Sequence, residues 1–401
     1  MRHPSFTIGC FVVVSCLFSC KNPSTHDAVQ VVSSSDLLDE TLQNLYQEKH
    51  IPGFAVAVFT KDTVLFEKGF GFADLDVKRQ YTPNTKQMLA SISKTFIGVS
   101  LMKSVGEGKI DLDAPINTYL SFEVKNPYHP DMPITVRQLA MHTSSINDSL
   151  EYNRSYLFET PLKKEDFDPA WHDLIARYND NVELPMDAFL KNILWKQGPW
   201  YHEANFYPYE PGAYYAYSNL GASLLAQIIA NVQAMPYEAY VEKEVFIPLQ
   251  MGRTTWKRPA VASGYITRYY KEDLMPFPGY TLITAPDGGI YSTVSDLTKF
   301  LQEIMKGYQG NGTLLQPSAY ATMLQSNLDT DSFPDALCWD LSVPCCIGHA
   351  GNDFGTSTLM YFEPKTGVGR ILFANVSLDS EPQEAEFYDI FNALFEFDLR
   401  P

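Results

Sequence analysis

The sequence GFAVAVF at residues 53–59 is an unbroken apolar run, short enough and rich enough in Val and Phe to indicate a buried β-strand. The polar pair Lys61-Asp62 follows it, and residues 64–70 then form a second strand-like run. Two such runs joined by a short polar segment predict a β-hairpin. The sheet of this protein is therefore expected to begin near the start of the folded chain.

A second strand pair is expected near the other end of the chain. Residues 356–362 and 369–376 are strand-like runs on either side of the turn-forming segment 363–367. Elsewhere the apolar spacing is helical, with helices predicted at 36–49, 91–107, 135–141, 218–232, 237–246, 295–305 and 387–397. We therefore expect an α+β fold, sandwich-like, in which N- and C-terminal segments form one antiparallel sheet flanked by helices, with an inserted mainly helical lobe.

Size and composition indicate one globular unit. The chain has 401 residues, of which 45% are hydrophobic and 19% charged, enough to bury a large core. We expect a domain over residues 36–401, with a sheet lobe at about 36–90 and 285–401 and a helical lobe at about 91–284. The formal net charge of -17 repels phosphate backbones, so nucleic acid is not an expected partner.

The first 20 residues have the pattern of an export signal. A basic start precedes the apolar run at 6–18, which is too short to span a hydrocarbon core of about 30 Å as a helix. Leu17-Phe18-Ser19-Cys20 resembles a bacterial lipoprotein signal, in which the cysteine is lipidated. We expect Cys20 as a lipid anchor, 21–35 as a flexible tether, and a place on the periplasmic or cell-surface side of the bacterial envelope. Secretion without a lipid is the alternative.

Three further cysteines lie outside this segment, at Cys338, Cys345 and Cys346. In an oxidising compartment, Cys338 can pair with either of the two adjacent cysteines, which leaves one thiol over. The three lack a histidine at zinc-site spacing, so they indicate no metal site.

The first chemical motif is Ser91-Ile92-Ser93-Lys94. A serine hydroxyl attacks a carbonyl only if a nearby base takes its proton. If a helix begins at Ser91, Lys94 lies on the same face, with Cβ atoms roughly 5–6 Å apart, and its apolar neighbours favour a lowered lysine pKa. The same spacing recurs at Ser100 and Lys103. Ser100 is expected in mid-helix, without spare backbone donors for an oxyanion, and is assigned to structure.

Two later motifs supply further groups for the same chemistry. In Tyr217-Ser218-Asn219, a phenol can relay a proton and a carboxamide can hold a lysine and a substrate carbonyl. In His349-Ala350-Gly351-Asn352, small residues ahead of the strand expected from Thr356 let a substrate backbone approach closely. The aromatic-rich stretch 200–217 is either a cleft wall or a packing loop.

The order Ser-x-x-Lys, Tyr-x-Asn, His-x-Gly resembles the serine β-lactamase and DD-peptidase superfamily, on its class C β-lactamase and esterase side. The similarity covers roughly residues 36–397. The resemblance implies Ser91 as the acylated nucleophile, with Lys94 and Tyr217 sharing the base and acid roles. It further implies substrate binding by Asn219, His349 and Gly351, with an oxyanion hole formed by the backbone N–H groups of Ser91 and Asn352. No metal or cofactor is implied.

Departures from the family pattern bear on the substrate. His349-Ala350-Gly351 stands where members that grip a carboxylate tend to carry Lys-Thr-Gly, and Ser145 and Gln250 each replace a usual glycine. The expected reaction is hydrolysis of carboxylic esters or of D-amino-acid peptides and amides, with peptidoglycan-derived molecules among the candidates. A class C-like β-lactamase or penicillin-binding DD-carboxypeptidase is the alternative within the enzymes. A non-catalytic receptor for cell-wall fragments or β-lactams is the alternative of another class.

Other candidate motifs are assigned to structure. The sequence Lys365-Thr366-Gly367 falls at the turn between two expected strands. His142 is expected to be a structural histidine, and His202-Glu203 lacks the second histidine of a zinc-protease helix. The chain has no Gly-x-Ser-x-Gly elbow, so it offers no α/β-hydrolase nucleophile.

Overall fold

The structure is a computed structural model that describes residues 33–259, 269–271, 274–325 and 336–400. The expected signal segment with Cys20, and residues 21–32 of the expected tether, lie outside these residues and stay predictions. The last three tether residues were wrongly expected to be flexible, because Ser33 caps and Ser34 begins the helix α1 (Ser34–Tyr46). Within the described residues, no helix has both the length and the apolar character needed to cross a bilayer.

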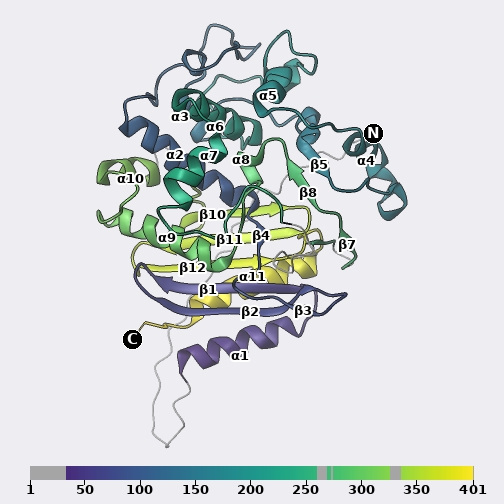
Figure 1. Ribbon diagram of the computed structural model, residues 1–401, viewed down its shortest axis with the longest axis vertical. Coiled ribbons are helices and arrows are strands. Elements are labelled where there is room, and N and C mark those ends of the chain that lie inside the picture. Colours follow the sequence, from purple (N-terminus) through teal and green to yellow (C-terminus); the bar gives the residue numbers. More distant parts are fainter. Residues whose placement is uncertain (1–32, 260–268, 272–273, 326–335, 401) are drawn as a thin grey trace, which may run out of the picture.

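A six-stranded antiparallel sheet forms the centre of the structure, and its strands come from both ends of the chain (Figure 1). The spatial order is β10-β11-β12-β1-β2-β3, with β1 paired to β12 so that Phe54 faces Ala374. This confirms the expected α+β class with a sheet built from N- and C-terminal segments. The strands are β1 (Gly53–Thr60), β2 (Val64–Asp74), β3 (Arg79–Gln80), β10 (Ile347–Asp353), β11 (Thr356–Glu363) and β12 (Val368–Ala374).

The sheet is covered on both faces, which explains why β1 is apolar throughout. One face packs against α1 (Ser34–Tyr46) and α11 (Glu381–Glu396), and the other against α9 (Val294–Tyr308) and the helical lobe (Figure 1). Side chains of a strand alternate between faces. Phe54, Val56 and Val58 belong to the core with α1 and α11, and Ala55, Ala57 and Phe59 to the core on the other face.

The helical lobe lies between the two sheet-forming segments and packs around α2 (Lys94–Gly106) and α6 (Asn219–Gln233), which contact each other. Its other helices are α3 (Val136–Ala140), α4 (His172–Asn179), α5 (Met186–Leu194) and α7 (Tyr237–Val241), and a π-helical turn at Glu242–Phe246 continues α7. Beyond residue 284, α8 (Ala285–Gly288) contacts α6 and α10 (Pro317–Leu324) contacts α2. Short two-stranded sheets pair β4 (Gln87–Met88) with β9 (Tyr291–Ser292), β5 (Tyr156–Phe158) with β8 (Tyr280–Leu282), and β6 (Tyr269–Tyr270) with β7 (Pro276–Phe277).

The strand β10 differs from the sequence expectation. Residues 349–352 were expected to lead into the strand from Thr356, whereas they belong to a separate edge strand that pairs antiparallel with β11, Asn352 facing Ser357. Gly and Asn, and to a lesser degree Ala, are depleted in strands, so the composition gave no strand signal there. The closing helix also begins earlier than residue 387, at Glu381, since polar residues fill its first turn.

The three described cysteines are present as thiols rather than as a bridged pair. Cys338 is part of the core that includes the helical lobe, whereas Cys346 belongs to the core on the opposite face of the sheet. This separation explains why Cys338 and Cys346 do not form a pair.

Candidate active site

Ser91 lies in a 3-10 turn, Ala90–Ser93, that leads directly into α2. The helix was expected to start at Ser91, and in the structure its α-helical part starts at Lys94. Ala90, just before the serine, has a left-handed backbone with φ 47°. Ser91 is partly exposed, whereas Ser100 in the middle of α2 is fully buried. Only Ser91 therefore presents a hydroxyl that a substrate can reach.

Lys94 is fully buried directly behind Ser91. Its Nζ lies 3.1 Å from Ser91 Oγ, 2.6 Å from Asn219 Oδ1 and 2.6 Å from the backbone oxygen of Asp287. The three contacts fix the amine from three separate elements: the turn before α2, the start of α6, and α8. Ser91 of the Ser-x-x-Lys motif and Asn219 of the Tyr-x-Asn motif thus both contact Nζ of Lys94.

Burial is the main electrostatic influence at this centre. It lowers the pKa of Lys94 below its usual value, and the carboxylates of Asp287 and Asp148 oppose the shift. Burial also raises the pKa of Asp287 to about 7, although the nearby Lys94 lowers it. The neutral amine of Lys94, which is the form that accepts a proton, is therefore more populated than that of a lysine on the surface.

Tyr217 packs against Lys94 through the face of its ring, whose centroid lies 5.0 Å from Nζ. The ring is held from behind by His142, with centroids 4.3 Å apart, and Nδ1 of His142 accepts a hydrogen bond of 3.1 Å from the backbone N–H of Ser218. Burial, followed by the nearby Lys94, sets the pKa of His142 well below its usual value. His142 is therefore a neutral side chain that positions Tyr217, consistent with its structural assignment.

Asp148 is a residue that the sequence did not single out. Its carboxylate accepts hydrogen bonds from the Ser218 hydroxyl at 3.0 Å and from the backbone N–H groups of Asn219 at 2.7 Å and Leu220 at 2.9 Å. An acidic group in this place satisfies the free N–H groups at the start of α6. Asp148 lies far from α6 in the sequence, so no local spacing pointed to it.

The edge strand β10 runs beside Ser91. A Cβ atom added to Gly351 would collide with the Leu89 carbonyl oxygen and lie 3.1 Å from the Ser91 nitrogen, so only glycine allows this approach. Gly348 exchanges both backbone hydrogen bonds with Asp340 on the outer side of β10. Since strand groups alternate with a period of two, the N–H of Asn352 faces the same outer side.

His349 is a buried neighbour of Tyr217, with ring centroids 6.4 Å apart, and its Nδ1 lies 2.5 Å from the Ala350 oxygen. Burial lowers its pKa to about 4, with Lys94 adding to the shift and Asp340 opposing it. The imidazole is thus neutral near pH 7. The side chain of His349 therefore brings no positive charge to the neighbourhood of Tyr217.

The remaining candidates lie elsewhere. Lys365-Thr366-Gly367 forms the turn between β11 and β12, where Gly367 has φ 68°, which confirms the turn assignment. In the aromatic stretch, Tyr207 and Tyr209 stack with centroids 5.2 Å apart, and Asn126 Nδ2 donates to both of their backbone oxygens. These contacts are those of a packed loop.

Residues 38–395 match the sequence profile of the family described as Beta-lactamase. The chain belongs to the β-lactamase family. Among curated relatives, it is 23% identical over 358 residues to Protein flp of Staphylococcus aureus (strain MW2), covering 88% of this chain and 65% of that protein. It is 28% identical over 276 residues to the putative penicillin-binding protein PbpX of Bacillus subtilis (strain 168), covering 67% of this chain and 59% of that one. The chain thus spans somewhat less than two thirds of these relatives.

A solved structure supports the β-lactamase-family fold. The octameric penicillin-binding protein homologue from Pyrococcus abyssi superposes with a TM-score of 0.67 at 22% identity, covering 90% of this chain and 77% of that one. At this identity the likeness concerns the fold alone.

The two glycine replacements in the β-lactamase-family pattern keep the backbone that glycine favours. Ser145 has φ 63° and Gln250 has φ 54°, both left-handed. Ser145 is stabilised locally, because its hydroxyl accepts a hydrogen bond of 2.8 Å from Asn126 Nδ2. The turns are therefore retained at the expense of local backbone strain.

Proposed function

We propose that this protein is a serine hydrolase that forms an acyl-enzyme on Ser91 and acts on carboxylic esters or on D-amino-acid peptides and amides. The observation that carries the proposal is the buried Lys94 Nζ at 3.1 Å from Ser91 Oγ, with a lowered pKa. A base in hydrogen-bond reach of a serine is the arrangement that nucleophilic catalysis needs.

The contacts of Lys94 suit the neutral amine. Its two N–H bonds can donate to the oxygens of Asn219 and Asp287, which directs the lone pair at Ser91. Ser91 Oγ then bonds to the substrate carbonyl carbon while its proton passes to Nζ. When the tetrahedral intermediate collapses, the leaving group takes a proton from Lys94, directly or through Tyr217. Water later attacks the acyl carbon, gives its proton to the same base, and releases Ser91.

We assign the oxyanion hole to the backbone N–H groups of Ser91 and Asn352. The support is the close approach of β10 to Ser91 at Gly351 and the outward orientation of the Asn352 N–H. Asn219 would bind the substrate carbonyl group as well as Lys94.

The neutral His349 favours substrates without a carboxylate at this subsite. A β-lactam or a peptide C-terminus carries a carboxylate, and family members that bind it tend to use a lysine there. In this chain the imidazole of His349 is uncharged above about pH 4. The carboxyl groups of Asp148 and Asp353 lie close enough to Lys94 to affect its pKa, so any negative charge on them would repel a substrate carboxylate nearby. An ester or a peptide with a neutral group here fits this environment better than a free carboxylate.

Two other functions remain candidates. A β-lactamase or DD-carboxypeptidase activity is favoured by the family match and by the similarity to the putative penicillin-binding protein PbpX. A non-catalytic receptor for cell-wall fragments is disfavoured, because a pure binding site has no need of a buried lysine beside the serine. We further propose that the protein is exported and held at the cell envelope through a lipid on Cys20, with a small molecule or peptide as its partner.

A probe and turnover experiment separates these functions. The protein is incubated with a fluorophosphonate and with a labelled penicillin, and the adduct is located by mass spectrometry. Turnover of p-nitrophenyl esters, a chromogenic cephalosporin and D-Ala-D-Ala peptides is then compared for wild type and Ser91→Ala. We expect the adduct on Ser91 and ester turnover that is lost in Ser91→Ala. Turnover that survives this substitution would refute the mechanism, and a stable adduct without turnover would favour the receptor.

The substrate preference is tested by His349→Lys. A permanent cation at this position is expected to raise kcat/KM for carboxylate-bearing substrates by roughly 10–100-fold relative to neutral esters, in line with a charged hydrogen bond of roughly 1.5–3 kcal/mol. An unchanged ratio would mean that this subsite does not select substrates by charge.

A further inference from the structure

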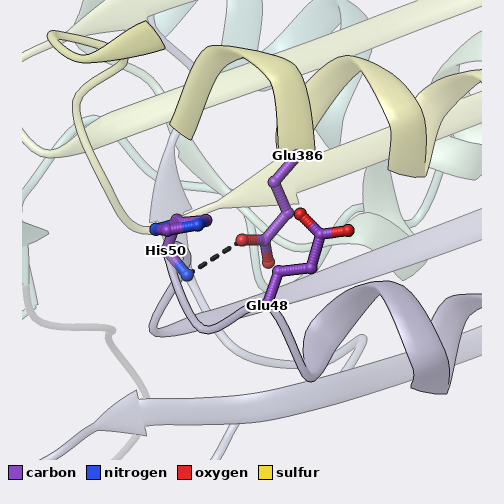
Figure 2. Close-up of side chains that lie close together, drawn as sticks. All are labelled: Glu48, His50 and Glu386. Atoms are coloured by element: carbon purple, nitrogen blue, oxygen red, sulfur yellow. Dashed lines mark hydrogen bonds between the residues drawn. The ribbon is translucent and has the colours of Figure 1, made fainter. Parts of the chain in front are cut away.

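Three side chains that can bind metal ions lie close together at α11 (Figure 2). This helix covers the face of the sheet opposite to the helical lobe. Glu48 and His50 come from the loop between α1 and β1, and Glu386 comes from α11. Their ligand atoms all lie within 4.8 Å of one another. In the described ranges, no other set of three His, Cys, Asp or Glu side chains comes this close together.

Glu386 has a buried carboxylate oxygen whose hydrogen-bonding capacity is not used. It is a fully buried carboxylate, and its Oε2 accepts a hydrogen bond of 2.9 Å from the backbone N–H of His50. Its Oε1 is buried and makes no hydrogen bond of normal geometry. Figure 2 shows the carboxylate directed between His50 and Glu48. A buried carboxylate oxygen without a partner is costly, and a cation between these side chains would remove that cost.

The local electrostatics agree with this interpretation. The ligand oxygens of Glu48 and Glu386 lie within 4.8 Å of each other, and Glu386 is buried, which disfavours its ionised form when no cation is near. Two carboxylates this close repel each other when both are ionised. A divalent cation would neutralise both and reverse the effect.

The backbone already holds the candidate ligands in place. The His50 peptide is fixed to α11 on both sides, because its N–H donates to Glu386 and its oxygen accepts a hydrogen bond of 3.2 Å from Gln383 Nε2. The buried ligand is thus immobile, whereas the exposed Glu48 and His50 side chains can rotate toward an ion. Binding of a cation here would therefore require only rotation of the Glu48 and His50 side chains and no movement of the backbone.

We propose that Glu48, His50 and Glu386 bind a divalent transition-metal ion, for which Zn²⁺ is the best match. One imidazole nitrogen and two carboxylate oxygens are ligands that Zn²⁺ accepts, with water in the fourth position. Mg²⁺ and Ca²⁺ prefer sites made of oxygen ligands alone, so the histidine disfavours them. The ion would join the loop after α1 to α11 and stabilise that layer, remote from the chemistry at Ser91.

Zn²⁺ binding to the full chain tests the proposal. The protein for this titration is prepared without a histidine tag and with Cys345→Ser, which removes an exposed thiol that could itself bind the ion. Calorimetric titration and equilibrium dialysis with metal analysis are expected to give one Zn²⁺ per chain. Zn²⁺ should also raise the melting temperature, because it binds the folded state.

Substitutions assign the ion to this cluster. His50→Ala removes the ring but keeps the backbone N–H that donates to Glu386, so folding should be retained while Zn²⁺ binds at least tenfold more weakly. Glu386→Gln should have the same effect, and His202→Ala, at another exposed histidine, should have none. Equal affinity in His50→Ala and His202→Ala, or binding well below one equivalent, would overturn the proposal. If Glu386→Gln does not fold, His50→Ala decides alone.

Discussion

The carboxylate of Asp148 accepts a 2.7 Å hydrogen bond from the backbone N–H of Asn219, whose side chain in turn contacts Lys94 at 2.6 Å. Asp148 reaches none of the reacting atoms, yet it fixes the start of α6 that carries Asn219. The amine beside Ser91 is thus oriented through a residue from a separate loop. Mutation of that loop should act on the reaction through geometry.

Asp148→Asn is expected to lower kcat for ester hydrolysis by roughly 10–100-fold, the factor that corresponds to loss of charged hydrogen bonds of about 1.5–3 kcal/mol. KM should change much less, because the substrate does not touch Asp148. Steady-state kinetics measure both, with the exposed Asp180→Asn at the end of α4 as control. An unchanged kcat with a lowered melting temperature would show a purely structural role.

The rate should depend on pH through Lys94. Below its pKa the amine is protonated and cannot accept the serine proton, so kcat/KM for a neutral ester should rise with pH. The midpoint should lie below the usual lysine value of 10.5, since burial lowers the pKa. His349 is neutral above about pH 4, so His349→Gln should keep the same midpoint even where the rate changes. A midpoint that moves in His349→Gln would assign the titration to the histidine.

Gly351→Ala should impair both activity and folding. The added methyl group would meet the Leu89 backbone oxygen and Thr358 Oγ1 and would approach the Ser91 nitrogen. Overpacking of this kind costs about 1–3 kcal/mol, and displacing β10 should reduce kcat by about 100-fold or more. Gly252→Ala, where a Cβ would meet nothing within 4 Å, is the control for denaturant unfolding and ester turnover. Wild-type kcat in Gly351→Ala would contradict the close approach of β10.

Gln250→Gly should stabilise the protein by about 0.5–1 kcal/mol. The exposed Gln250 has φ 54°, a conformation that costs a residue with a side chain about 1–2 kcal/mol. Glycine avoids this strain, but its greater backbone freedom in the unfolded chain offsets part of the gain. Denaturant unfolding measures the change, with Gly310→Ala, at φ 81°, as the reverse case. A destabilised Gln250→Gly would mean that its side chain makes contacts that outweigh the strain.

The sequence predicted those parts of this protein that depend on local pattern. The apolar run at 53–59, the hairpin around Gly367 and the Ser91–Lys94 spacing are each visible within a few residues, and the structure has them where expected. Strand β10 was missed because its pairing with β11, rather than its composition, makes it a strand. Asp148 and the Glu48, His50 and Glu386 cluster were missed because their contacts join segments far apart in the chain.

The sheet also constrains the order in which the chain can fold. Strand β1 hydrogen-bonds to β2 on one side and to β12 on the other, so its two neighbours are far apart in the sequence. Pairing between such distant segments requires closure of a very long loop and is slow. The sheet is therefore incomplete until β12 has been made, and refolding from denaturant should show a late, slow step at which β1 pairs with β12.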